Sequence, residues 1–142
     1  MDNTKIINEI KELKKDFLLE INSWTTLGEL ANNSGTIILP DKRIYSYSIF
    51  FNDQNNLPQN IHSYIKEFPT LTDNQYGLVL KFIEEENLLD ANFDQKKFEE
   101  AGFTISVKLN GKEKTINNCV SFDKKNPKIY DKLLTFIENN LN

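Results

Sequence analysis

The first apolar pattern in the chain is that of an amphipathic helix. Apolar residues recur at intervals of three or four positions at Ile6, Ile10, Leu13, Phe17 and Ile21. This spacing places them on one side of a helix. Asp2 or Asn3 can cap its start, and the polar residues 32–35 break the pattern. We therefore expect a helix from the N-terminus through Ile21.

Two further helical patterns lie in the middle of the chain. A short helix is expected at residues 61–68, which Pro69 ends. Thr72 and Gln75 have the spacing of a capping box and open a second helix. Its apolar stripe comprises Tyr76, Val79, Leu80 and Ile83.

The last third of the chain contains two more helical patterns. A short helix is expected over residues 94–101, with Gly102 as its left-handed cap. Asn126 and Pro127 then have the order of a helix cap and a first helical position. The buried stripe of this last helix is expected to be Tyr130, Leu133, Leu134, Ile137 and Leu141.

Alternation of side chains predicts a β-hairpin over residues 36–51, with its turn at residues 40–43. In its second strand, one face carries Tyr45, Tyr47, Ile49 and Phe51. The other face carries Ile44, Ser46, Ser48 and Phe50. Neither face is purely polar, so we expect cover on one side and partial cover on the other.

A second hairpin is predicted over residues 103–118, because Asn110-Gly111 is a preferred two-residue turn. That turn pairs Lys108 with Glu113 and Ser106 with Thr115, which are favourable cross-strand neighbours. The return strand carries lysines on the side that should be apolar. Lysines of this kind protect a sheet edge from aggregation, so we expect an exposed edge strand.

The order of these elements predicts the fold class. Two hairpins are separated by helices, without strand–helix–strand alternation, and this order favours an α+β fold. At 142 residues the chain has the size of one domain, residues 1–142. We expect an antiparallel sheet of four to five strands built from hairpins 36–51 and 103–118. The N- and C-terminal helices and a central helical segment should pack on it, with the terminal helices on one face.

Composition narrows the class of protein. Hydrophobic residues make up 39% and charged residues 27%, which excludes a disordered or collagen-like chain. The sequence has neither an apolar run long enough for a bilayer nor the pattern of a secretory signal. The single cysteine, Cys119, cannot form an internal disulfide. These features favour a cytoplasmic protein.

Residues for catalysis and metal binding are scarce. One histidine, His62, and one cysteine, Cys119, are too few for a structural zinc site. Residues 90–94 alternate oxygen-bearing side chains but lack the glycine and distal glutamate of a calcium loop. The glycines are isolated, so no phosphate-binding loop is present. We expect no metal, no cofactor and no catalytic residue.

Charge is unevenly distributed along the chain, although the net charge is only −4. The segment 84–100 contains two lysines and the acidic residues Glu84, Glu85, Glu86, Asp90, Asp94, Glu99 and Glu100. The segment 104–128 contains six lysines and two acidic residues. One explanation is a set of solvated helix faces and a protected sheet edge. The other is an acidic surface that attracts a basic partner.

The tyrosines of the first hairpin allow two interpretations as well. A tyrosine on a strand usually completes the core and places its hydroxyl at the rim. If one face of the strand is open, Tyr45 and Tyr47 are natural anchors for a partner.

Three functional hypotheses remain. The first is a non-catalytic protein-binding domain that neutralises a basic partner, as bacterial immunity and antitoxin proteins do; the analogy is one of size and charge only. Its binding residues would be Glu84, Glu85, Glu86, Asp90, Asp94, Tyr45 and Tyr47. The second is a small metal-independent enzyme that uses carboxylates and tyrosines, recognisable by a concave pocket and a strongly shifted pKa. The third is nucleic-acid binding by hairpin 104–118. The presence of only one arginine in the chain and its net negative charge disfavour this hypothesis. The oligomeric state stays open.

Overall fold

A computed structural model describes residues 3–25, 31–51, 62–90, 101–119 and 128–141. The elements in chain order are α1 (Asn3–Leu13), a 3₁₀ helix η1 (Lys14–Asp16), β1 (Leu19–Thr25), β2 (Asn32–Ile38), β3 (Ile44–Phe50), β4 (Tyr64–Phe68), α2 (Asp73–Glu85), β5 (Ala101–Leu109), β6 (Lys112–Cys119) and α3 (Lys128–Asn140). The presence of both helices and strands in this order confirms the α+β fold.

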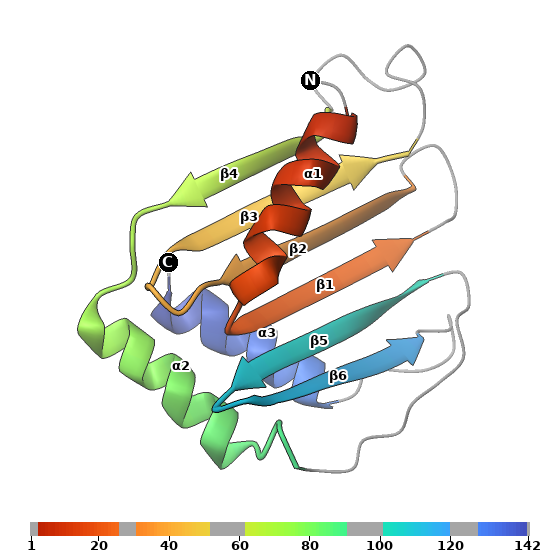
Figure 1. Cartoon of the computed structure of the whole chain (residues 1–142). Helices are drawn as coiled ribbons and strands as arrows, with labels where there is room; N and C mark the ends of the chain where they lie inside the picture. Colours follow the sequence, from red (N-terminus) through yellow and green to blue (C-terminus); the bar gives the residue numbers. More distant parts are fainter. Residues whose placement is uncertain (1–2, 26–30, 52–61, 91–100, 120–127, 142) are drawn as a thin grey trace.

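The strands form one antiparallel sheet in the order β4-β3-β2-β1-β5-β6 (Figure 1). The prediction of an antiparallel sheet is confirmed, but six strands are present instead of four or five. The two additional strands are β1, at the centre, and β4, at one edge.

The two faces of the sheet carry separate apolar clusters. On one face, α1 packs against β2 and β3; this cluster includes Ile6, Ile10, Phe17, Ile37, Leu39, Tyr47 and Ile49. On the other face, α2 and α3 pack against a larger cluster that includes Ile21, Ile38, Val79, Ile83, Phe103, Ile105 and Leu133. The terminal helices therefore lie on opposite faces, and the expectation that they share one face is wrong. Both faces of the central strands bear apolar residues, so each needs a helix.

The second hairpin has the predicted register. Ser106 pairs with Thr115 and Lys108 with Glu113, around a turn in which Asn110 and Gly111 both have positive φ. Positive φ at both positions is what this turn type requires. The return strand, β6, lies at the edge of the sheet, as predicted.

The first hairpin is also confirmed as the pair β2–β3, but β2 is longer than the sequence indicates. Residues 32–35, which we interpreted as a break, form the first half of this strand. Their polar side chains find partners on neighbouring strands: the hydroxyls of Ser34 and Ser48 are 2.7 Å apart, and Asn22 donates to Asn33. Cross-strand hydrogen bonds thus replace the apolar contacts that strand prediction relies on.

The predicted N-terminal helix through Ile21 is too long. α1 ends at Leu13, and Leu19 to Thr25 form β1. Ile21 continues the helical spacing from Phe17, but the two residues lie on opposite faces of the sheet, Phe17 in the cluster beneath α1 and Ile21 in the cluster beneath α2 and α3. The backbone N–H of Leu18 donates to Ile38, and its carbonyl accepts from Lys108, so the chain has already entered the sheet there.

The helix expected at residues 61–68 is likewise wrong, since Tyr64–Phe68 form β4. Tyr64 and Phe68 are four positions apart, a spacing that fits both the helical period and the period of two in a strand. Pairing with β3 determines that this segment is a strand: Ile65 pairs with Tyr47 and joins the apolar cluster beneath α1.

The remaining helix predictions have mixed outcomes. The capping box at Thr72 and Gln75 is present at the start of α2. Gly102 is not a helix cap but a residue of β5, and the helix expected at 94–101 otherwise lies outside the described residues. Asn126 and Pro127 also lie outside them. In α3, Leu133 is buried, whereas Leu134, which we expected in the buried stripe, is 42% exposed.

None of the helices in the described ranges is long and apolar enough to cross a membrane.

Candidate functional site

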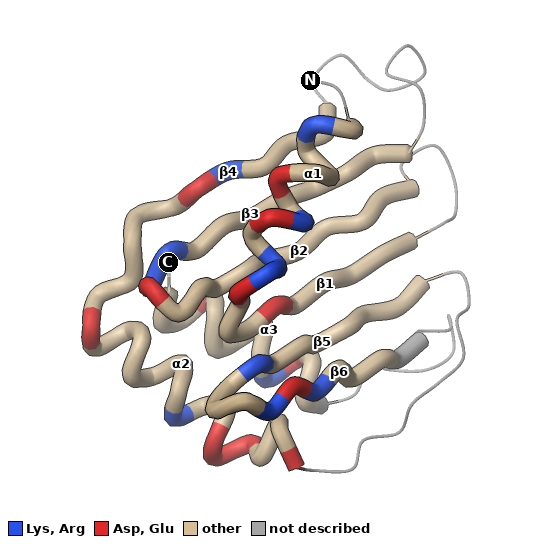
Figure 2. The backbone as a smooth tube through the Cα atoms, in the orientation of Figure 1, with Lys and Arg blue, Asp and Glu red and all other residues tan. Residues whose placement is uncertain are grey.

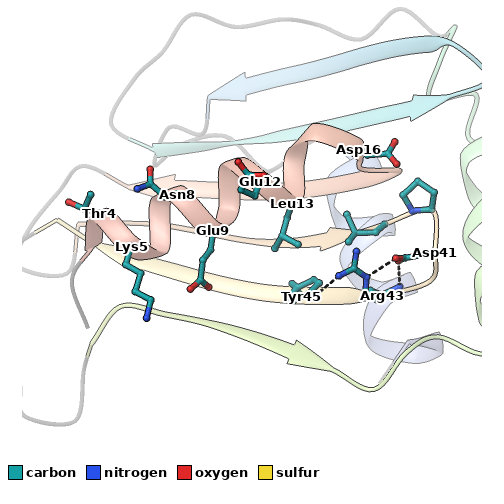
Figure 3. A pocket seen from close by; sticks show the side chains of 12 residues that line it. Thr4, Lys5, Asn8, Glu9, Glu12, Leu13, Asp16, Asp41, Arg43 and Tyr45 are labelled. Atoms are coloured by element: carbon teal, nitrogen blue, oxygen red, sulfur yellow. Dashed lines mark hydrogen bonds and ion pairs between the residues drawn. The ribbon is translucent and has the colours of Figure 1, made fainter.

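An open groove of about 1080 Å³ runs between α1 and the turn that joins β2 to β3 (Figure 3). We call it the α1 groove. Its lining comprises Thr4, Lys5, Asn8, Glu9, Glu12, Leu13, Asp16, Leu39, Pro40, Asp41, Arg43 and Tyr45. Four of these residues are acidic and two are basic, so the groove carries an excess of negative charge.

The strand side of the groove is organised around Arg43, the only arginine in the chain. Its Nε donates to Asp41 at 2.7 Å, and Nη1 donates to the hydroxyl of Tyr45 at 3.2 Å. The guanidinium carbon lies 5.9 Å from the centre of the Tyr45 ring, within the range of a cation–π contact. Arg43 therefore orders the aromatic residue and the carboxylate on this side.

Local backbone geometry places these side chains together. The turn is closed by hydrogen bonds from Leu39 N–H to the Arg43 carbonyl and from Lys42 N–H to the Leu39 carbonyl. Burial opposes ionisation of Asp41, but hydrogen bonds from the backbone and side chain of Arg43 outweigh it and lower the pKa of Asp41. The carboxylate therefore stays charged at neutral pH.

The helix side of the groove contributes the other charges. Figure 2 shows acidic and basic residues interspersed along α1. Figure 3 shows Lys5 and Glu9 extending from the helix towards the strands. Glu12 forms an exposed ion pair with Lys15 at 2.8 Å.

The acidic residues singled out from the sequence lie elsewhere, at the end of α2 and just beyond it. Glu84 and Glu85 are exposed. Glu85, Glu86 and Asp90 lie 3.7, 3.3 and 3.5 Å from Lys81, Lys132 and Lys112, respectively.

These ion pairs offset part of the negative charge at the end of α2. Asp94, Glu99 and Glu100 lie outside the described residues. Tyr45 lies on the α1 side of the sheet, so the structure does not bring it together with the acidic residues of α2.

A second hollow, of about 570 Å³, lies along the other flank of α1. We call it the Glu20 cavity. Its lining comprises Ile7, Ile10, Lys11, Lys14, Phe17, Glu20, Asn22, Asn33, Tyr47, Ile49, Phe51, Thr104, Ser106, Glu113 and Thr115. α1 thus forms a ridge between two concave surfaces.

A buried polar network forms part of this cavity. Glu20 is only 2% exposed; its Oε1 lies 2.9 Å from the ammonium of Lys14, and its Oε2 accepts a hydrogen bond of 2.9 Å from the Tyr47 hydroxyl. That hydroxyl also accepts from Asn22 Nδ2 at 2.7 Å. Burial, and then the negative charge of Glu20, raise the pKa of Tyr47 far above its ordinary value.

Tyr47 reaches this network across Gly35. Tyr47 is on β3 and Glu20 on β1, with Gly35 on β2 between them. A Cβ atom at Gly35 would lie 2.6 Å from the Tyr47 hydroxyl oxygen and 2.7 Å from the Ile21 carbonyl oxygen. The glycine therefore leaves the space in which the tyrosine lies.

Of the two interpretations of the hairpin tyrosines, Tyr47 fits the first, because it is 3% exposed and completes the core. Tyr45 is half-buried and lines the α1 groove. Sequence reasoning did not find Glu20, Asn22 or Gly35. An isolated glycine within a strand often marks the close approach of another group, so Gly35 could have indicated this network.

Other residues considered from the sequence lie apart from both hollows. His62 is exposed just before β4. Cys119 is the last residue of β6 and pairs with Gly102. Within the described part of the chain, no three or more histidine, cysteine, aspartate or glutamate residues are grouped as a metal would require.

No family model matches the chain, and no curated protein matches it. We therefore infer function from the α1 groove and the Glu20 cavity.

Proposed function

We propose that this chain is a non-catalytic protein-binding domain that neutralises a basic partner, in the manner of a small cytoplasmic bacterial immunity or antitoxin protein. We further propose that the α1 groove is its acidic binding surface. The observation that supports this role is the groove itself, a concave surface that combines one half-buried tyrosine with four carboxylates and two basic residues.

The groove has the composition of a protein-binding surface. Leu13, Leu39 and Tyr45 provide apolar and aromatic area, and charged side chains surround it. Interfaces typically have an apolar centre and a polar rim, and tyrosine is enriched among the residues that contribute most to affinity. Since Arg43 already orders the Tyr45 hydroxyl, the ring loses little conformational entropy when a partner covers it.

The charge of the groove favours a basic partner. Glu9, Glu12, Asp16 and Asp41 exceed Lys5 and Arg43 in number. Glu12 is paired with Lys15 and Asp41 with Arg43, but exposed pairs of this kind contribute little to stability. A cationic side chain of a partner can therefore compete for these carboxylates, and the negative field speeds its approach.

The acidic end of α2 stays a prediction as a second contact area. Three of its carboxylates lie within ion-pair distance of lysines of the same chain. These pairs are largely exposed, like those of the groove, so a basic partner can compete for them in the same way. We assign the main contact to the groove because it is concave and places Tyr45 beside its carboxylates.

The enzyme hypothesis expects a concave pocket with a strongly shifted pKa. The Glu20 cavity has this feature, because it contains a carboxylate and Tyr47, whose pKa is strongly raised. The upward shift of the Tyr47 pKa argues for a role other than catalysis. A tyrosine with a raised pKa stays protonated and donates to Glu20, so it is a poor general base. Both oxygens of Glu20 are already engaged, by Lys14 and by Tyr47. This arrangement favours an ordered recognition site.

Copurification with the product of the adjacent open reading frame tests the proposed function. The expected result is a stable complex in which the partner's activity is inhibited. The groove variant Glu9→Lys/Glu12→Lys should weaken that complex at least about tenfold, since charge reversal within an interface is costly.

A matched variant, Asp131→Lys/Glu138→Lys, carries the same change of charge at exposed positions of α3, on the opposite face of the sheet, and controls for the effect of net charge. Failure to form any complex would contradict the proposed function. Equal weakening by the two variants would contradict the assignment to the groove and leave only a general electrostatic attraction.

A further inference from the structure

The Glu20 cavity contains a buried carboxylate that is ion-paired with an exposed lysine side chain. Glu20 is 2% exposed, whereas the side chain of Lys14 is 43% exposed. Lys14 belongs to η1, the short 3₁₀ turn that follows α1. The cation that neutralises Glu20 is therefore the most accessible part of the network.

The remaining groups around Glu20 are fixed. Tyr47 donates to one carboxylate oxygen and is held by Asn22, and Gly35 provides its space. Asn22 also donates to the carbonyl oxygen of Ser34 at 3.2 Å. Such a network orients an acceptor before a ligand arrives, which lowers the entropic cost of binding.

Lys14 satisfies Glu20 through one contact of 2.9 Å to one oxygen. An ammonium group is a compact point charge on a flexible stem, so a cation with better geometry can replace it. Lys14 and Glu20 both line the cavity of about 570 Å³, so a ligand in the cavity that displaces Lys14 can reach Glu20.

Arginine has the chemistry that this cavity would accept. A guanidinium is planar and presents several donors, which suits a carboxylate together with neighbouring oxygen acceptors. Glu20, Glu113 and the hydroxyl of Thr115 supply acceptors along the lining, and the apolar side chains of Ile10, Phe17 and Ile49 can contact an arginine stem.

We infer that the Glu20 cavity accepts an arginine side chain of the protein partner, whose guanidinium takes the place of Lys14 on Glu20. This inference rests on the proposed function, because it names the side chain through which the partner is recognised on the second flank of α1. It concerns a different surface from the α1 groove, so the two can be tested separately.

A chemical-rescue experiment with the purified chain tests the inference without the partner. Lys14→Ala removes the internal cation and leaves Glu20 charged and buried, so the melting temperature should fall. Millimolar N-acetyl-arginine amide should restore several degrees of that loss by binding to the folded state. The control Lys15→Ala removes a neighbouring lysine whose partner is Glu12, outside the cavity, and should show no such restoration.

Two further measurements identify the site. In Lys14→Ala/Glu20→Gln, which lacks the carboxylate, the arginine probe should have no effect. In the unmodified chain, the probe should shift the backbone amide resonances of Glu20 and Thr115 in an NMR titration, and this measurement remains informative if Lys14→Ala does not fold.

The inference is overturned if the probe leaves those resonances unchanged, or if it stabilises all variants equally. It is also overturned if N-acetyl-lysine amide acts as well as the arginine compound. None of these results depends on complex formation with the partner, which is the test of the proposed function.

Discussion

At the scale of single residues, Gly35 leaves no room for a side chain where it faces Tyr47. A glycine inside a strand usually weakens it, because no side chain packs there. Here the missing Cβ leaves room for a tyrosine that crosses from β3 to Glu20 on β1. The polar network of the Glu20 cavity depends on this one absent atom.

Replacement of Gly35 by alanine should therefore destabilise the chain by about 1–3 kcal/mol, because the new Cβ meets the tyrosine ring and a backbone carbonyl. Gly77→Ala is the matched control. Gly77 lies inside α2 with no atom within 4 Å of its added Cβ, and alanine should stabilise that helix by about 1 kcal/mol. Urea denaturation measures both changes, and a neutral Gly35→Ala would contradict the role of the glycine.

The raised pKa of Tyr47 predicts a loss of stability at alkaline pH. The unfolded chain releases the phenol proton near the ordinary pKa of 10.0, while the folded chain retains it. Stability from this group is complete below about pH 10 and is lost as the pH rises towards the folded pKa.

Denaturation curves recorded from about pH 8 to pH 11 should show a steeper decline for the unmodified chain than for Tyr47→Phe. The comparison cancels the contributions of all ionisable groups that the two proteins share. Parallel pH profiles would indicate that Tyr47 ionises as easily in the folded chain as in the unfolded one.

At the scale of elements, the start of α2 is fixed by reciprocal hydrogen bonds. Gln75 N–H donates to the Thr72 hydroxyl at 3.1 Å, and Thr72 N–H donates to the Gln75 side chain at 2.9 Å. α2 covers the larger apolar cluster, so this cap supports the face opposite α1.

Thr72→Ala should lower the free energy of unfolding by about 1 kcal/mol, the usual cost of a lost N-cap. Thr70→Ala, at an exposed position two residues earlier and outside any helix or strand, should change it little. Thermal or urea unfolding provides the measurement. Equal effects of the two substitutions would show that the cap contributes nothing beyond a surface threonine.

Elements with a specific local signal could be predicted from the sequence. Asn110-Gly111 determined the register of β5 and β6, and Thr72 with Gln75 determined the start of α2. β4 was missed because a spacing of four, as between Tyr64 and Phe68, fits a helix and a strand equally well, and β1 was missed because Ile21 continues the helical spacing of the residues before it. Only pairing with β2, β5 and β3 resolves that ambiguity, and pairing is not a local property.

The candidate sites were less predictable than the elements for the same reason. Tyr45 could be singled out as an aromatic residue on a partly covered strand, but three of the four carboxylates in its groove come from α1 and η1. The Glu20 network joins residues from η1, β1 and β3, which no local motif connects. The acidic run at 84–86 is conspicuous in the sequence, yet in the structure Lys132 of α3 pairs with Glu86, and Lys81 of the same helix pairs with Glu85.

At the scale of the whole molecule, α1 covers only part of one face of the sheet (Figure 1). This partial cover leaves a concave surface on each flank of the helix, the α1 groove and the Glu20 cavity. A partner that straddles α1 can contact both at once. Because α2 and α3 occupy the opposite face, we expect recognition on the α1 side.

Amide hydrogen exchange of the complex with the product of the adjacent open reading frame tests this assignment most directly. Slower exchange is expected in η1 and in the turn at residues 39–43, with little change in α2. Protection confined to the end of α2 or to β4, with no change beside α1, would contradict it.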